Sequence, residues 1–387
     1  MQPQPVKKNR IDVIDALRGF AVMAILLVHS IEHFIYNVYP PQTILDEGTL
    51  TVIFSLFAGK AYAIFALLFG FTYYIQLANR QAKGDDFAGR FVWRLMLLAG
   101  FATLNAAFFP GGDVLSLFCI TGLALPLVRK LSNKWVFAIA IIFLLQPVEL
   151  YHYAASLFHA GHTLPDLGVA KLYGEVFDAV KTGNWGTFLT TNITTGQAAT
   201  LLWAVGAGRF GQTIGLFLLG YLLARKQLFV PSEKNTAFWT KTLITAAIAF
   251  GPLYALKVQI ADGTSVDLIK QSVGTAFDMW QKLAFTLVLV SGFVLAYQRE
   301  TFQKWTTSLR FYGRMSLTNY IGQSILGALV FFPIGLNLAP HTGYFASLLI
   351  GVALFAVQLA FCKLWLKTHK QGPLETLWHR LTWLKSK

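Results

Sequence analysis

The sequence predicts an all-α, polytopic integral membrane protein with about ten transmembrane helices. Three observations predict it: an excess of apolar residues, a shortage of charged ones, and a regular alternation of basic and non-basic loops. The chain has 387 residues, of which 55% are hydrophobic and 13% charged, and its mean hydropathy is +0.54. Soluble domains carry roughly 25% charged residues, so we expect lipid to form part of the solvent.

A helix that crosses a bilayer needs roughly 20 mostly apolar residues. The predicted spans, in chain order, are 13–37, 51–78, 91–109, 114–128, 135–151, 211–228, 238–256, 276–297, 312–332 and 344–366. The first span is long and lacks a small-residue cleavage site, so we expect a retained helix and not a signal peptide.

The loops between these spans alternate in charge. Lys and Arg precede the first span and follow every second span, whereas the loops 38–50, 110–113 and 333–343 contain neither residue. The positive-inside rule therefore places both termini in the cytoplasm. It also accounts for the net charge of +14 without a nucleic-acid partner, which we do not expect.

The chain is expected to form one transmembrane helical domain over residues 1–366 and a cytoplasmic basic tail over 367–387. The long connection 152–209 is expected on the outer side as short interfacial helices. The tail mixes Lys and Arg with Trp378, Leu381 and Trp383, which is typical of an amphipathic helix on a membrane surface.

Ionisable residues inside a membrane span are costly and are functional candidates by default. His29 lies toward the outer end of the first span, where a neutral imidazole can act as a general base near pH 7. A structural histidine bonded to a neighbouring helix fits the sequence equally well. Glu32 and His33 share the face of His29 and are candidate substrate-binding residues. Residues 29–33 also match the H-x-x-E-H zinc pattern, but no downstream ligand motif follows, so no metal is expected.

Three further residues are candidates at mid to outer depth. Lys60, deep in the second span, requires an anion, a carboxylate or a cavity unless it reaches the headgroups. Asp113 either orients His29 by accepting a hydrogen bond from a ring N–H or caps the fourth helix. Asn105 lies at a similar depth in the third span.

The inner ends of the spans carry arginines suited to phosphate groups. These are Arg18, Arg94 and Arg314, although anchoring on the cytoplasmic side would explain them too. Asn319 and Gln323 line one face of the ninth span and are candidate substrate-binding residues or inter-helix hydrogen-bonding partners. Together these residues predict a polar passage with a reactive outer end and an anion-binding inner mouth.

Five stretches of the sequence resemble the YeiB-like membrane protein family, which is defined by a domain of unknown function. They are residues 15–28, 60–70, 112–122, 215–225 and 313–324. The first span, with its Arg18-Gly19 pair, is also similar to the transmembrane acyltransferase superfamily. That group includes the sugar O-acyltransferases of bacterial envelopes and the lysosomal heparan N-acetyltransferase.

The superfamily resemblance implies that acyl-CoA enters from the cytoplasm, that the acceptor binds on the far side, and that His29 is the catalyst. YeiB-like members typically carry Asn where this chain has His29, and often His where it has Asn105, so the two residues appear exchanged between helices. The implied location is the bacterial inner membrane. A homo-oligomer is compatible with the sequence.

Two functional hypotheses follow. In the first, Arg18, Arg94 and Arg314 bind acyl-CoA as donor, and His29 deprotonates a hydroxyl or amine of an envelope glycan or lipid. Asp113 would orient His29, and Lys60 or Asn105 would stabilise the oxyanion. In the second, the same residues serve a transporter or flippase for a small anionic or lipidic solute.

Overall fold

The computed structural model describes residues 11–35, 43–111, 114–159 and 161–384. Every regular element in these ranges is helical, and no strand occurs in them. Five helices are long and apolar enough to cross a membrane, or seven if two strongly bent helix pairs each form one span. The all-α membrane fold is thereby confirmed, while the count of ten spans and the side of the termini stay predictions.

Each of the five long spans consists of one helix or of two consecutive helices. They are α1 (Asp12–Ile31), α2 (Ile44–Phe57) with α3 (Lys60–Gln81), α13 (Glu233–Gly263), α14 (Asp267–Ile269) with α15 (Thr275–Ala296), and α19 (Tyr344–Trp365). The bent pairs are α7 (Asn133–Leu144) with α8 (Pro147–Phe158), at 53°, and Trp185–Gly206 with α12 (Arg209–Arg225), at 79°.

The remaining helices are shorter or less apolar. They are α4 (Ala88–Ala106), α5 (Val114–Thr121), α6 (Ala124–Val128), α9 (Val169–Lys181), α10 (Trp185–Thr191), α11 (Gln197–Gly206), α16 (Glu300–Trp305), α17 (Thr307–Arg314), α18 (Ser316–Phe331) and α20 (Pro373–Thr382).

Several predicted span limits are wrong, each for a local backbone reason. The first span ends at Ile31 and not at residue 37, because His33, Phe34 and Ile35 adopt positive φ angles that end the helix. The second begins at Ile44 and breaks at Gly59, whose φ is +76°. The ninth is divided at Met315 between α17 and α18.

The predicted outer loop 152–209 is largely helical. It contains α9, α10 and α11, and its last part joins α12 across the 79° bend. The loop predicted after the seventh span is also shorter than expected, because α13 extends to Gly263 and includes Lys257.

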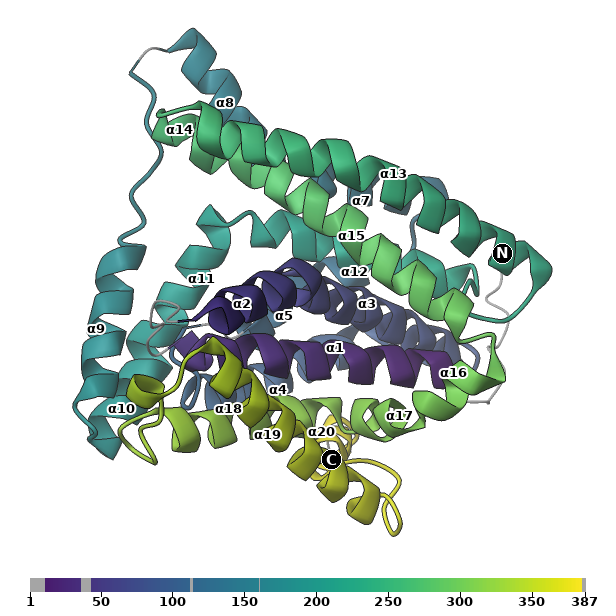
Figure 1. Ribbon diagram of the computed structural model, residues 1–387. Coiled ribbons are helices and arrows are strands. Elements are labelled where there is room, and N and C mark those ends of the chain that lie inside the picture. The colour runs from purple at the N-terminus through teal and green to yellow at the C-terminus, as the bar shows by residue number, and fades with distance from the viewer. Residues whose placement is uncertain (1–10, 36–42, 112–113, 160, 385–387) are drawn as a thin grey trace.

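Helix α1 runs through the centre of the bundle, in contact with α3, α17 and α19 (Figure 1). The α9–α11 segment lies at one end of the molecule and α16 at the other. The end with α16 and the start of α1 is called the inner end, following the loop charges, and the α9–α11 end is called the outer end. α13 packs on α15 at the periphery, with exposed apolar side chains such as Ile248 suited to lipid.

Glycines bring two helix pairs into backbone contact. A Cβ atom at Gly70 of α3 would lie 1.9 Å from the Phe217 carbonyl oxygen, and one at Gly220 of α12 would lie 1.8 Å from that of Leu67. Likewise, a Cβ atom at Gly19 of α1 would lie 2.0 Å from the Leu309 carbonyl oxygen, and one at Gly313 of α17 would lie 1.9 Å from that of Asp15. Small residues at such contacts are typical of membrane helices, and here they fix α1 and α3, which carry the site residues.

Candidate active site

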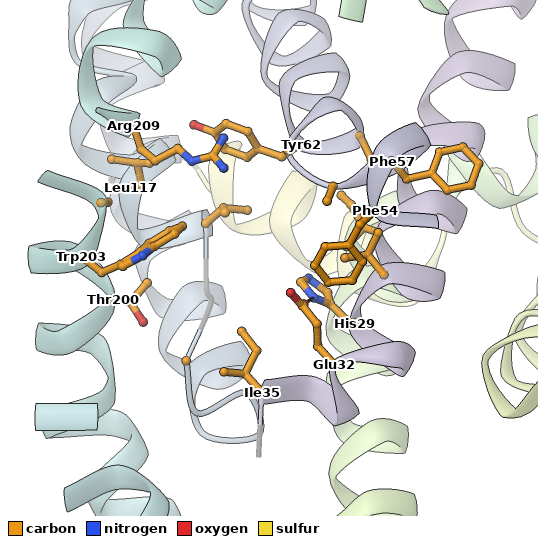
Figure 2. Close-up of a pocket in the computed structure, with 18 of the residues that line it drawn as sticks. His29, Glu32, Ile35, Phe54, Phe57, Tyr62, Leu117, Thr200, Trp203 and Arg209 are labelled. Atoms are coloured by element: carbon orange, nitrogen blue, oxygen red, sulfur yellow. Dashed lines mark hydrogen bonds and ion pairs between the residues drawn. The ribbon is translucent and has the colours of Figure 1, made fainter. Parts of the chain in front are cut away.

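A cavity of about 410 Å³ lies beside the outer end of α1. It is called the outer cavity. It is formed between α1, the α2–α3 break, α9, α11, α12 and α15 (Figure 2). Its polar and aromatic lining includes His29, Glu32, Phe54, Tyr62, Tyr173, Thr200, Trp203, Arg209, Lys282 and Tyr320.

His29 and Glu32 form a side-chain pair in this cavity. They are three residues apart where α1 ends, so their side chains share a face, and His29 Nδ1 lies 3.2 Å from Glu32 Oε2. The His29 ring also packs against Phe109, with the ring centres 4.6 Å apart. A carboxylate on Nδ1 favours the tautomer whose proton lies there, which leaves Nε2 able to accept one.

Among the described residues, Glu32 is thus the carboxylate that contacts His29, a contact that the sequence suggested for Asp113. Asp113 lies outside the residues that the structure describes. Glu32 could have been recognised from its i, i+3 spacing to His29, a signal that the sequence reading used only to place it on the same face. Both side chains remain accessible, at 18% for His29 and 25% for Glu32.

Two cations that sequence reasoning missed also line the outer cavity. Arg209 begins α12 directly after Gly208, whose φ is +64°, and its Nη1 donates to Gln212 Oε1 at 3.0 Å. Lys282 of α15 pairs with Asp278, which also binds Lys257 at 2.8 Å. Asp278 and Lys282 lie inside the predicted span 276–297. Ionisable residues within a membrane span are functional candidates, so the reasoning applied to Lys60 identifies these two residues as well.

Lys60 and Asn105 do not line the outer cavity. Lys60 is 4% exposed, and its Nζ donates to the Phe54 carbonyl at 3.3 Å. Asn105 is fully buried, and its side-chain oxygen accepts a hydrogen bond from Ser324 Oγ at 2.8 Å. Their positions give no support to the oxyanion role that the sequence suggested.

His33, Asn319 and Gln323 line neither the outer cavity nor the second cavity described below. His33 Nε2 lies 2.7 Å from Ser347 Oγ, because the left-handed turn after α1 separates His33 from the face of His29. The three polar groups of the H-x-x-E-H pattern therefore do not converge. Asn319 donates to the Tyr312 carbonyl at 2.9 Å and contacts Cys362 Sγ. Gln323 is buried, and its side-chain amide has no hydrogen-bond partner among the described residues.

A second cavity, of about 260 Å³, lies at the inner end and is called the inner cavity. Arg18, Arg94 and Arg314 all line it, so the structure brings together the three arginines of the first, third and ninth predicted spans. Arg18 donates to Asp15 at 3.2 Å and to Thr72 at 3.0 Å.

Helix α20 of the tail closes the inner cavity and contributes Glu375, Trp378 and His379 to its lining. Glu375 accepts hydrogen bonds from the backbone N–H groups of Leu317 and Thr318, at 2.7 and 3.1 Å, where α18 begins. Burial raises the pKa of Glu375 despite these bonds. Burial and nearby Arg94 lower the pKa of His379, which favours a neutral imidazole at pH 7.

Arg94 is the arginine that α20 covers most directly. Its Nη1 donates to Thr382 Oγ1 at 3.3 Å, and its guanidinium lies 4.1 Å from the centre of the Trp378 ring. Trp378 Nε1 in turn donates to the Arg94 carbonyl at 3.1 Å. Displacing α20 would therefore expose a cation at the mouth of the inner cavity.

An aromatic layer separates the two cavities. Phe65 and Phe118 line the inner cavity, and Tyr320 lines the outer one. The Phe65 ring stacks on both of the others, with centroid distances of 5.9 Å to Phe118 and 6.4 Å to Tyr320. The three rings therefore link the lining of the inner cavity to that of the outer cavity.

Comparison with known proteins assigns the chain to a family. Residues 10–250 match the family described as "Heparan-alpha-glucosaminide N-acetyltransferase, catalytic", a region that contains His29, Glu32, Arg18, Arg94 and Arg209. The chain belongs to this family. Residues 223–385 match a second family, described as "Protein of unknown function (DUF418)".

The full-length relatives have no described activity. "Uncharacterized protein YxaH" of Bacillus subtilis is 26% identical over 98% of this chain and 96% of its own. "Uncharacterized protein YeiB" of Escherichia coli is 24% identical over 95% of each chain. These matches confirm the predicted YeiB-like family and its relation to transmembrane acyltransferases. No solved structure matches the chain.

Proposed function

We propose that the protein is a membrane acyltransferase that moves an acyl group from acyl-CoA in the inner cavity to a hydroxyl or amine in the outer cavity. The observation that carries this proposal is the position of the His29–Glu32 pair. It opens into one cavity at the outer end of α1, while Arg18, Arg94 and Arg314 line another at the inner end. The acceptor would be an envelope glycan or lipid outside a bacterial inner membrane.

The inner cavity suits only part of the donor. Its volume of about 260 Å³ lies below the roughly 300–1,000 Å³ of sites for drug-sized ligands. The acyl-pantetheine arm would enter it, and the donor's phosphates would lie at the three arginines, since guanidinium groups match phosphate oxygens. The thioester then has to pass the Phe65–Phe118–Tyr320 layer to approach His29.

The reaction requires one base and returns one proton. His29 Nε2 takes the proton from the acceptor as its oxygen or nitrogen forms a bond to the thioester carbonyl carbon. Glu32 stabilises the resulting imidazolium through Nδ1–H. When the tetrahedral intermediate collapses, the carbon–sulfur bond breaks and the proton on His29 passes to the CoA thiolate.

The arginine cavity makes a prediction about donor binding. Arg94→Gln is expected to raise the KM for acetyl-CoA by about 10–100-fold, because hydrogen bonds to charged groups are worth roughly 1.5–3 kcal/mol. Arg129→Gln is the matched control, since Arg129 pairs with Asp86 and does not line the inner cavity. An equal rise in both variants would contradict donor binding at Arg94.

The proposal is tested by following CoA thiol release from purified full-length protein, with acetyl-CoA and longer acyl-CoA donors and a panel of glycan and lipid acceptors. We expect release that depends on both donor and acceptor, with the acyl group recovered on the acceptor. Failure of every acyl-CoA to bind, at any chain length, would overturn the proposal.

A transporter or flippase is the second candidate, and the bent helices favour it. The pairs with 53° and 79° bends are broken spans of the kind found in many transporters. In that case, flux of an anionic or lipidic solute across proteoliposomes would occur with no acylated product.

A further inference from the structure

Among the described residues, four basic side chains lie at or near one side of the outer cavity. Arg209 and Lys282 line it, and Lys60 and Lys257 lie within electrostatic range behind them. Among the residues that the structure describes, Asp278 is the one carboxylate in ion pairs with these four cations, and it binds Lys257 and Lys282. Arg209 has a neutral hydrogen-bond partner, Gln212, and no ion pair within the described ranges.

Other carboxylates nearby form no ion pair with Arg209 among the described residues. Glu32 lines the same cavity, and it pairs with His29. Glu149 lies behind Gly208, where its Oε1 is 3.1 Å from the position of a Cβ atom, and it forms no ion pair among the described residues. A cation at membrane depth is costly unless it pairs with a partner. Arg209, which forms no ion pair among the described residues, therefore favours an anionic ligand.

Arg209 and Lys282 converge on one point. A Cβ atom at Gly59 would lie 2.9 Å from Lys282 Cδ and 3.4 Å from Arg209 Nη2. The glycine at the α2–α3 break therefore leaves the space in which the two cationic side chains approach each other. Aromatic rings flank the guanidinium, whose carbon lies 5.0 Å from the centre of Tyr62 and 5.8 Å from that of Trp203.

We propose that Arg209 and Lys282 bind a phosphate group carried by the acceptor. A guanidinium fork with an adjacent ammonium matches phosphate oxygens, and Trp203 offers a face on which a sugar ring can stack. In Figure 2, Arg209 and Tyr62 lie along one side of the cavity and His29 and Glu32 along another. A phosphate held at Arg209 would thus direct another group of the same molecule toward His29. The identification of this ligand as the acceptor rests on the proposed acyl transfer.

The phosphate could belong to a soluble sugar phosphate or to a lipid headgroup, and one binding experiment separates them. Full-length protein in phosphatidylcholine nanodiscs is titrated with glucose 6-phosphate and with glucose. We expect the phosphate ester to bind at least about tenfold more tightly, and Arg209→Gln and Lys282→Gln to remove that preference. Lys171→Gln is the control, because Lys171 is exposed on α9 and does not line the cavity.

The lipid source is tested in phosphatidylglycerol nanodiscs. If the headgroup occupies the site, this lipid raises the melting temperature relative to phosphatidylcholine, and Arg209→Gln abolishes the increase. Either result supports the proposal and identifies the source. An absence of both effects, or an equal loss in Lys171→Gln, overturns it.

Arg209→Lys is the control for misfolding. Lysine keeps the positive charge but lacks the planar guanidinium group, so this variant should retain part of the preference for glucose 6-phosphate over glucose. The outcome is also separable from the proposed function. Acetyl transfer to a phosphorylated sugar that is unchanged in Arg209→Gln would overturn phosphate recognition and leave acyl transfer standing. Phosphate binding without any acyl transfer would support phosphate recognition and overturn the proposed acyltransferase function.

Discussion

Replacing His29 with alanine is expected to lower the rate of acyl transfer by about 10²–10⁴-fold, the usual contribution of a general acid–base residue. His29 is the imidazole in the outer cavity, and Glu32 bonds one of its nitrogens. Because His29 lies far from the arginines of the inner cavity along α1, the KM for acyl-CoA should change little. The loss should therefore appear in kcat, measured as CoA release at saturating donor.

Two variants place the effect in the His29–Glu32 pair. Glu32→Gln should give a smaller reduction than His29→Ala, since the amide keeps a hydrogen bond to Nδ1 but does not stabilise the imidazolium. His341→Ala should have wild-type activity, because His341 is exposed and lines neither cavity. Full activity in a correctly folded His29→Ala protein would exclude His29 as the base.

Gly220→Val is expected to have the largest effect on the fold. The Cβ atom would fall 1.8 Å from the Leu67 carbonyl oxygen, an approach to backbone that no side-chain rotation relieves. The α3–α12 contact would have to open, at a cost at or above the roughly 1–3 kcal/mol typical of overpacked cores. The loss should appear as a lower melting temperature in detergent and a smaller monodisperse fraction.

Gly292→Ala is the matched control for Gly220→Val. Gly292 lies within α15, and no atom comes within 4 Å of the position of its Cβ. Alanine there should leave stability unchanged or raise it by about 0.4–1 kcal/mol, because it restricts the unfolded chain. Comparable destabilisation by both substitutions would show that the close α3–α12 contact is not the reason why Gly220→Val destabilises the protein.

The fold class followed from the sequence because it depends on composition, which is a property of the whole chain. The helix breaks at Gly59 and at His33–Ile35 did not, since a break inside an apolar run leaves hydropathy unchanged. Both breaks position side chains around the outer end of α1. The first leaves the space shared by Arg209 and Lys282, and the second directs His33 to Ser347.

The inner and outer sites differ in how much the sequence revealed. Arg18, Arg94 and Arg314 were identifiable because helix ends of the same orientation meet at one membrane face. Arg209 was not, because its place in the cavity depends on the 79° bend between the α10–α11 segment and α12. Tyr173, Thr200 and Trp203 stand in the predicted outer loop, and pattern alone gave no reason to place them against α1.

Sided membrane vesicles test whether donor and acceptor react from opposite ends of α1. Radiolabelled acetyl-CoA, which does not cross the membrane, is supplied on one face, and a panel of glycan acceptors on the other. We expect labelled acceptor only when acetyl-CoA is on the face that carries Arg18, Arg94 and Arg314, and none with His29→Ala. Equal labelling with the donor on the His29 face would show that the two substrates do not react from opposite ends of α1.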